Sequence, residues 1–392
     1  MADYLLIVPL FLAVAAGWWL GRREAGVRAM AREQALSRDY LTGLDHLVDE
    51  RTDDAIESFI RALEFKPESL TAHLALAKLL RKKGDVERAI KLHQGLLDRP
   101  GLAPNDRLRV QMAQARDYDA VGLLDRAEVL LQEVIDSSPP AEMRIEALQL
   151  LVKLYEKEGE WQRALEVAAS LDRDCRKDIR HELAHYCCEL AEHQLRHAGY
   201  DAAEDWLKRA LKHDPQAVRA SLLQAGVRIA RQQWRPAIQA LQQVVEQDPL
   251  FVSEILQPLQ QCYRGLDRED DYQNSLRGLM ARAPSTSLIL ALAEQIRDTR
   301  GVYAAGAFIT AELKRRPSIR GFNRLIDMHI EHGARSARDS LEVLHGLTDQ
   351  LEQSKPRYRC DQCGFAGRLL LWQCPSCRQW GSTRPIQGLE GE

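Results

Sequence analysis

Apolar residues follow two different patterns along this chain of 392 residues. Between Tyr4 and Leu20 they form one run without a charged side chain, and Arg22 and Arg23 end that run. Farther along, apolar and polar residues alternate with the spacing of amphipathic helices, and small residues recur about every 34 positions. The two patterns predict one membrane span followed by an array of helix pairs.

The first run predicts a transmembrane helix over residues 1–21. Its 17 uncharged residues would form a helix of about 25 Å, near the lower limit for crossing a hydrocarbon core of about 30 Å. A cleaved signal peptide is the alternative, but there positive charge precedes the apolar run, whereas here Asp3 precedes it and the arginines follow. Because Lys and Arg beside a span stay in the cytoplasm, we expect a retained anchor with its N-terminus outside and the bulk of the chain inside.

Composition favours a helical body and gives no reason to expect nucleic acid as a partner. The formal net charge is only −3, and aromatic residues make up 6% of the chain. Ala, Leu, Arg, Glu and Gln dominate, and runs of β-branched residues are hard to find. Of the eight cysteines, four form tight pairs near the C-terminus and four are scattered, which suits a reducing compartment.

A repeated unit is clearest at its first copy. Gly43, Ala55, Phe59, Ala62 and Pro67 stand at positions 8, 20, 24, 27 and 32 of a 34-residue unit. Two antiparallel helices approach closely where small residues stand at their crossing, a bulky residue fills the next layer, and Pro ends the second helix. In these positions the stretch closely resembles a tetratricopeptide repeat.

Later copies can be aligned on the same alanine. The alignment places Tyr272 in the slot between the last two alanines. The alanines are Ala55, Ala89, Ala127, Ala164, Ala203, Ala237 and Ala305. We therefore expect an all-α tetratricopeptide-repeat superhelix of eight repeats and a looser ninth helix pair over residues 36–354, after a linker over 22–35. Such arrays bind proteins or peptides along their surfaces.

An H-E-x-x-H motif lies within the fifth predicted repeat. His181, Glu182 and His185 match the pattern in which two histidines one helical turn apart bind zinc and the Glu acts as a base. A zinc hydrolase is therefore one alternative function. The third histidine of the longer metalloprotease motif is missing, and a repeat helix offers no evident cleft. We expect instead a polar, partly solvated helix face with Leu183 and Tyr186 turned inward.

Residues 355–392 differ abruptly from the repeats and predict a small metal-binding module. Cys360, Cys363, Cys374 and Cys377 form two C-x-x-C pairs separated by ten residues. Each pair bends the backbone so that two thiolates point at one metal, and two pairs complete a tetrahedral site for one iron or zinc ion. The module resembles rubredoxins and zinc ribbons, although Arg378 replaces the glycine expected after the second pair.

Basic and aromatic residues surround these cysteines and leave two functions open. Lys355 and five arginines stand near the pairs, with Phe365, Trp372 and Trp380 among them. The surface is suited either to RNA, in an RNA- or ribosome-associated adaptor, or to protein, including the adjacent repeats.

The order of anchor, repeats and four-cysteine module resembles the lipopolysaccharide assembly protein B family of Gram-negative inner membranes. The resemblance implies a regulatory adaptor and not an enzyme. The implied partners are a membrane-anchored AAA+ metalloprotease, the UDP-acyl-GlcNAc deacetylase of the lipid A pathway, whose degradation the adaptor promotes, and an inner-membrane signalling protein of the alkaline-phosphatase-like hydrolase type. It also implies a single-pass inner-membrane protein with a periplasmic N-terminus, and it carries the four cysteines over as metal ligands.

Overall fold

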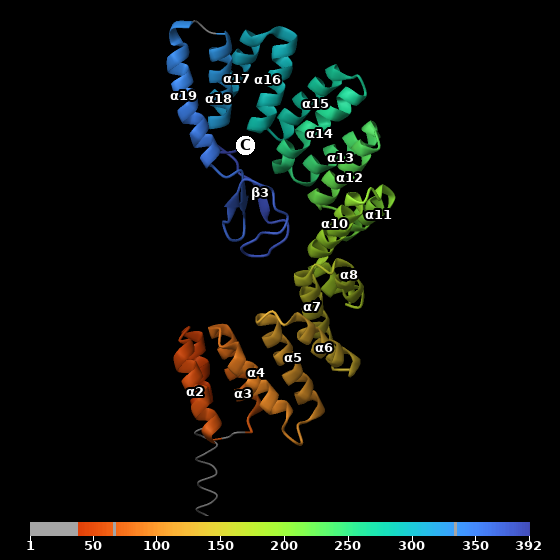
Figure 1. The fold of residues 1–392 in the computed structure, drawn as a ribbon, viewed down its shortest axis with the longest axis vertical. Coiled ribbons are helices and arrows are strands. Elements are labelled where there is room, and N and C mark those ends of the chain that lie inside the picture. Colours follow the sequence, from red (N-terminus) through yellow and green to blue (C-terminus); the bar gives the residue numbers. More distant parts are fainter. Residues whose placement is uncertain (1–37, 66–67, 333–334) are drawn as a thin grey trace, which may run out of the picture. The chain divides into compact units, whose positions relative to one another are not determined.

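The computed structural model describes residues 38–65, 68–332 and 335–392, which divide into two compact units between Glu160 and Trp161 (Figure 1). The predicted anchor over 1–21 and the linker over 22–35 lie outside the described residues, so both remain predictions. Within the described ranges, none of the helices combines the length and apolar character that crossing a bilayer requires.

The first unit consists of antiparallel helices in chain order. Residues 38–48 are helical and precede α2. The following helices are α2 (Thr52–Phe65), α3 (Leu70–Lys83), α4 (Val86–Leu97), α5 (Pro104–Ala120), α6 (Leu124–Asp136) and α7 (Ala141–Glu158). Each of these helices contacts the next one along the chain, as the predicted repeats require.

The second unit continues the same alternation and ends in strands. Its helices are α8 (Trp161–Ala169), α9 (Arg173–Asp178), α10 (Arg180–Arg196), α11 (Tyr200–His213), α12 (Val218–Ala230), α13 (Trp234–Gln247), the short η1 (Pro249–Phe251), α14 (Val252–Gly265), α15 (Glu269–Arg282), α16 (Thr286–Arg300), α17 (Val302–Arg315), α18 (Ile319–His332) and α19 (Arg335–Ser354). The repeat is longer than 34 residues here, since Ala164 and Ala203 are 39 positions apart, and the short helix α9 lies in this longer stretch.

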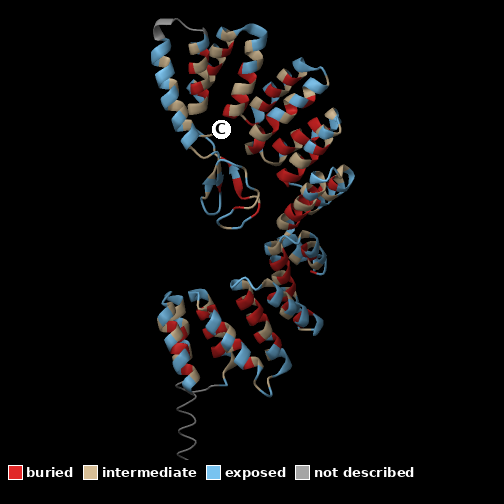
Figure 2. Cartoon of the chain, in the orientation of Figure 1, coloured by how far each residue is buried: buried red, intermediate tan, exposed pale blue. Residues whose placement is uncertain are grey.

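The alanines that marked the repeats lie at the helix crossings. All seven of them are 0% exposed, and Tyr272, which takes the intervening slot, is 4% exposed. In Figure 2 the buried residues line the facing sides of neighbouring helices. At the first repeat, a methyl group added to Gly43 would lie 3.1 Å from the ring of Phe59, which is itself fully buried. The tetratricopeptide-like fold is thus confirmed at the residues that predicted it.

The repeat pattern also predicts glycines in the turn between the two helices of a repeat, at Gly84, Gly122 and Gly159. Gly84 and Gly159 cap α3 and α7 with φ values of +94° and +74°, a left-handed conformation that glycine adopts without a steric penalty. Each donates its backbone N–H to a carbonyl of the last helical turn. The chain can therefore reverse within a few residues and begin the second helix.

The C-terminal module is a three-stranded antiparallel sheet in the order β2-β1-β3. Tyr358 pairs with Gly367 on one side and with Pro385 on the other. Its strands are β1 (Tyr358–Cys360), β2 (Ala366–Gly367) and β3 (Thr383–Pro385). We call residues 358–385 the ribbon. In Figure 1 the ribbon lies beside helices of the second unit, and the contacts described below hold it there.

Where two helices of the second unit cross closely, a larger side chain should destabilise the fold. A methyl group on Gly265 would lie 2.5 Å from the Trp234 ring, so Gly265→Ala should lower the free energy of unfolding by about 1–3 kcal/mol. Gly278→Ala is the matched control, because its methyl group would meet nothing within 4 Å and alanine is the better helix former. Denaturant unfolding measures both. Equal effects of the two substitutions would contradict the assigned crossing.

Candidate metal centre

Two tight backbone turns present the four cysteines. The N–H of Gly364 donates to the carbonyl of Cys360 at 3.0 Å, and the N–H of Arg378 donates to the carbonyl of Cys374 at 2.9 Å. Both residues after the pairs are left-handed, with φ of +77° at Gly364 and +61° at Arg378. The second turn therefore keeps its geometry although a non-glycine residue stands where that conformation is costly.

The sulfur atoms converge on one point. The Sγ atoms of Cys360 and Cys377 lie 3.7 Å apart, those of Cys363 and Cys374 lie 3.6 Å apart, and all four are within 4.8 Å of one another. A tetrahedron with metal–sulfur bonds of about 2.3 Å has edges of about 3.8 Å. These separations are too long for disulfide bonds, which need about 2.05 Å. The structure thus brings together all four predicted residues in a geometry that fits one metal ion.

Local hydrogen bonds favour the thiolate form that a metal requires. The hydroxyl of Ser382, 3.3 Å from the sulfur, and the backbone N–H groups after Cys360 lower the pKa of that cysteine to about 6. The N–H of Phe365 lowers the pKa of Cys363. At Cys377 the N–H of Gln379 acts in the same direction, but desolvation and the neighbouring sulfurs outweigh it and raise the pKa to about 11. Four thiols that meet at one point cannot all become thiolates easily unless a cation lies between them.

The ribbon is attached to the repeats through Trp380, which is only 7% exposed. Its indole stacks on the imidazole of His185, with ring centroids 5.0 Å apart and an interplanar angle of 22°. Trp161 and Tyr186 meet the indole edge-on at 5.8 and 6.2 Å. The guanidinium of Arg219 lies 5.9 Å from the indole centroid. Side chains from α8, α10 and α12 therefore enclose one aromatic anchor.

A second aromatic contact lies farther along the repeats. Trp372 stacks on Phe251 at 5.8 Å with an interplanar angle of 13°. Trp372 also packs against the hydrophobic core formed by α12 to α16. The hydroxyl of Tyr358 donates to a carboxylate oxygen of Glu254 at 2.8 Å. The aromatic surface predicted from the sequence thus faces the adjacent repeats at Trp372 and Trp380.

Two basic residues of the module, Arg384 and Lys355, have acidic partners. Arg384 lies 3.6 Å from a carboxylate oxygen of Asp248 on the repeats and 3.3 Å from one of Asp361 in the ribbon. Lys355 pairs with Glu390 at 2.8 Å. Part of the positive charge that suggested RNA is therefore paired within the protein.

The tail after the ribbon is tied to α16 and α18. The carboxylate of Glu392 accepts hydrogen bonds from the backbone N–H of Ser287 at 2.9 Å and from its hydroxyl at 2.6 Å, and Arg320 lies 3.1 Å away. The N–H of Ile319 donates to the carbonyl of Leu389. These bonds fix the chain on the C-terminal side of the ribbon.

The two histidines of the H-E-x-x-H motif lie against the ribbon. Nδ1 of His181 lies 2.8 Å from Asp214, and this hydrogen bond raises the pKa of the histidine and lowers that of the carboxyl. His185 is 3% exposed, and its burial, together with the charges of His181 and Arg219, keeps its pKa well below the ordinary value. A methyl group on Gly381 of the ribbon would lie 2.3 Å from Nε2 of His181, so only glycine fits there.

The expected solvated helix face is therefore wrong at His185. Leu183 and Tyr186 turn inward as predicted, each 1% exposed, but His185 is covered by the ribbon as well. Among the described residues, the four cysteines form the one group of His, Cys, Asp or Glu side chains close enough together to hold a metal ion, and the H-E-x-x-H residues do not belong to it. Nothing in the local spacing of the motif signals a partner about 195 residues away, so sequence reasoning missed this contact.

Comparisons with known proteins agree with the two parts of the fold. A family model described as "Rubredoxin metal binding domain" matches residues 358–385, and one described as "Tetratricopeptide repeat" matches 40–106 and 188–250. The chain is similar to lipopolysaccharide assembly protein B of Escherichia coli (strain K12), with 37% identity over 388 residues and 99% of each chain covered. It is also similar to the protein of the same name from Haemophilus influenzae, with 35% identity over 396 residues and 98% and 99% covered. Among solved structures, the C-terminal part of a Cytophaga hutchinsonii repeat protein aligns with a TM-score of 0.43 and 13% identity, covering 64% of this chain and 99% of that one.

Metal content tests the ligand set directly. The purified chain should contain about one zinc or iron ion, and Cys374→Ser should lose it because three thiolates leave the tetrahedral site open. Cys175→Ser, which changes a cysteine of α9 outside the ribbon, is the control and should keep the ion. Elemental analysis measures both variants. Full metal content in Cys374→Ser would refute the assignment.

Removal of the Trp380 side chain should detach the ribbon from the repeats without loss of its metal ion. Trp380→Ala should lower the stability of the docked state by about 3–5 kcal/mol, because the indole fills a closed site on the repeats. Trypsin should then cleave faster at Lys355 and Arg357, while the metal content stays unchanged. Leu369→Ala is the control, since Leu369 is 75% exposed. Unchanged cleavage in Trp380→Ala would show that the indole does not anchor the ribbon.

Proposed function

The chain belongs to the lipopolysaccharide assembly protein B family, and from this premise we propose that it is a membrane-anchored adaptor that promotes proteolysis of the lipid A pathway deacetylase. In this role it presents the deacetylase to a membrane-anchored AAA+ metalloprotease. An inner-membrane signalling protein of the alkaline-phosphatase-like hydrolase type opposes it. The chain itself performs no chemistry in this scheme.

The observation that carries the proposal is the extent of the match. Identity of 37% covers 99% of both chains, so the aligned region includes the N-terminal apolar run, the repeats and the ribbon. Stacked helix pairs offer long surfaces for protein partners, which supports an adaptor role. The family name concerns lipopolysaccharide assembly, which supports action at the membrane.

Tethering is the physical mechanism that we propose. The apolar run over residues 1–21 keeps the repeats at the cytoplasmic face of the inner membrane, with the N-terminus in the periplasm. A deacetylase bound by the adaptor then meets a protease on the same bilayer at an effective concentration in the mM range, without new contacts between them. Degradation of the deacetylase becomes faster because the deacetylase and the protease meet more often.

The ribbon supplies structure in this scheme. Four cysteine ligands close the coordination sphere of a tetrahedral ion, which leaves no position for a substrate. Cys360, Cys363, Cys374 and Cys377 would hold the ion, zinc or iron, and the ion would cross-link the two backbone turns. The cross-link keeps Trp380 positioned for its contact with the repeats.

Anchor replacement tests the tethering mechanism. A version lacking residues 1–21 should fail to restore regulated deacetylase turnover in cells that lack the native protein, because substrate and protease no longer share a surface with the adaptor. Pulse-chase measurement of deacetylase half-life provides the readout. An unrelated single span in the same orientation is the matched control and should restore turnover. Normal turnover with the anchorless version at normal expression would rule tethering out.

A further inference from the structure

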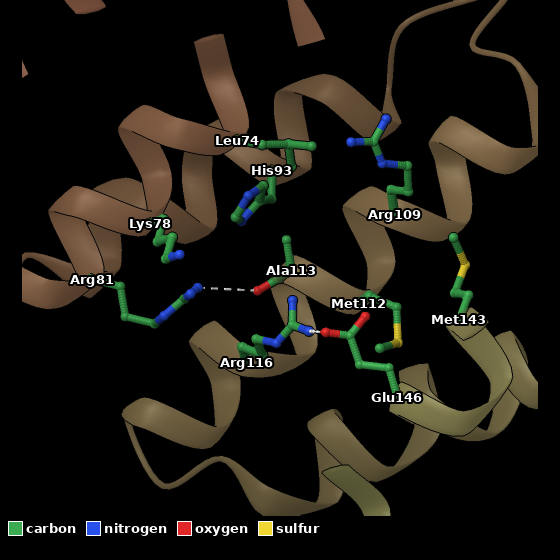
Figure 3. Close-up of a pocket in the computed structure, with 10 residues that line it drawn as sticks. All are labelled: Leu74, Lys78, Arg81, His93, Arg109, Met112, Ala113, Arg116, Met143 and Glu146. Atoms are coloured by element: carbon green, nitrogen blue, oxygen red, sulfur yellow. Dashed lines mark hydrogen bonds and ion pairs between the residues drawn. The ribbon is translucent and has the colours of Figure 1, made fainter. Parts of the chain in front are cut away.

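A cationic cavity lies in the first unit, away from the metal centre. It has a volume of about 210 Å³ and is formed by α3, α4, α5 and α7 (Figure 3). Lys78 and Arg81 reach it from α3, and Arg109 and Arg116 reach it from α5. Glu146 of α7 is the one acidic side chain among its lining residues. Four cations against one carboxylate favour an anionic ligand.

These cations differ in how far the protein neutralises them. Arg116 pairs with Glu146, as Figure 3 shows. Arg109 lies 3.5 Å from Asp106 on the same helix, with half of its side chain exposed. Lys78 has no ion pair or hydrogen bond among the described residues. Positive charge therefore remains available at Lys78 and Arg109.

A buried polar group fixes the back of the cavity. Asp117 is 0% exposed, and its two carboxylate oxygens lie 2.5 Å from Arg81 and 2.5 Å from Nδ1 of His93. Arg81 also donates toward the carbonyl of Ala113 at 3.4 Å (Figure 3). The guanidinium is thus held in one orientation at the cavity wall before any ligand arrives. Preorganised donors of this kind bind carboxylates with less loss of side-chain entropy.

The other nitrogen of His93 has no partner. The His93 side chain is 1% exposed and lines the cavity, yet its Nε2 makes no hydrogen bond within the described residues. Nδ1 bonds to Asp117, so Nε2 is left to bond a ligand, as an acceptor when the ring is neutral and as a donor when it is protonated. A buried polar atom without a partner is costly, so a ligand that brings a hydrogen-bonding group to this nitrogen would satisfy it. A peptide carries both N–H donors and carbonyl or carboxylate acceptors.

Apolar side chains complete the wall. Leu74, Met112 and Met143 line the same cavity as the cations. Methionine adapts to irregular apolar partners, and a small inorganic anion would gain nothing from it. The volume is below the roughly 300–1,000 Å³ of pockets that enclose whole small molecules, so a side chain or a chain end fits better than a large headgroup.

We propose that this cavity binds an acidic, partly apolar peptide segment of a protein partner. One carboxylate of the segment lies between Lys78, Arg81 and Arg109, and a neighbouring apolar side chain packs on Met112 and Met143. The pair between Arg116 and Glu146 shows that a carboxylate fits this wall. The site concerns the first unit alone and does not depend on the partners proposed above.

Peptide binding to the full-length protein in detergent tests the site. The probe is a short fluorescein-labelled peptide in which Glu alternates with Leu and which ends in a free carboxylate. The comparison peptide has Gln for Glu and an amidated end. Fluorescence anisotropy should show binding of the first peptide, weaker at high salt, and at least about tenfold weaker binding of the second.

Charge reversals locate the binding. Lys78→Glu and Arg109→Glu should each weaken binding of the acidic peptide by about tenfold or more. Both side chains are exposed, so the substitutions should leave the buried hydrogen bonds of Asp117 intact. Lys91→Glu makes the same charge change at an exposed position of α4 outside the cavity and should not weaken binding. Circular dichroism confirms that each variant is folded.

Three results would overturn the proposal. The first is equal affinity for the acidic and amidated peptides. The second is a loss in Lys91→Glu as large as that in Arg109→Glu, which would indicate attraction to overall charge. The third is displacement of the peptide by inorganic phosphate at matched ionic strength, which would indicate a general oxyanion site.

Discussion

Close approach of paired helices at small residues is the constraint on which the rest of this structure depends. Each marker alanine is fully buried, so the side chain has no room to grow without separating its helix from the next. At other positions the spacing is set by a bulky partner, as where Gly265 meets the Trp234 ring. Because contacts run between neighbours in the chain, each repeat positions the next. The aromatic site for the ribbon and the cationic cavity both use side chains from several such helices.

The ribbon depends on this scaffold as much as on its cysteines. A module of about 30 residues buries too little apolar surface to be stable alone and needs a metal, a disulfide or a larger partner. Here the thiolates converge as for a metal, and Trp380 and Trp372 add a large contact with the repeats. Both stabilising interactions act on the same short segment, since the second cysteine pair stands directly between the two tryptophans.

Sequence patterns predicted the features that obey local rules. Repeat alanines and turn glycines follow from the sterics of helices, and paired cysteines follow from the geometry of a metal site, so these positions could be read without a structure. The role of His185 could not, because its neighbour Trp380 is distant in the chain and the H-E-x-x-H spacing fits both a ligand set and a packed helix face. The cavity was missed for the same reason. Arg81, His93 and Asp117 lie on three helices, and each alone is an ordinary repeat residue.

The surface covered by Trp380 and the cationic cavity of the first unit place different demands on a protein partner. A partner that binds His185, Tyr186 or Arg219 must first displace the indole of Trp380, and this costs on the order of the few kcal/mol that a buried tryptophan contributes. At the cavity in the first unit, Lys78 and Arg109 line the wall and are exposed among the residues that the structure describes. In the proposed adaptor role the cargo has to be released to the protease, and moderate affinity at an open charged site suits that role better than displacement of a packed module. The contacts of Trp380 thus fit a structural role for the ribbon within the second unit, and under the same proposal weak, charge-dependent contacts of the repeats are better suited to cargo.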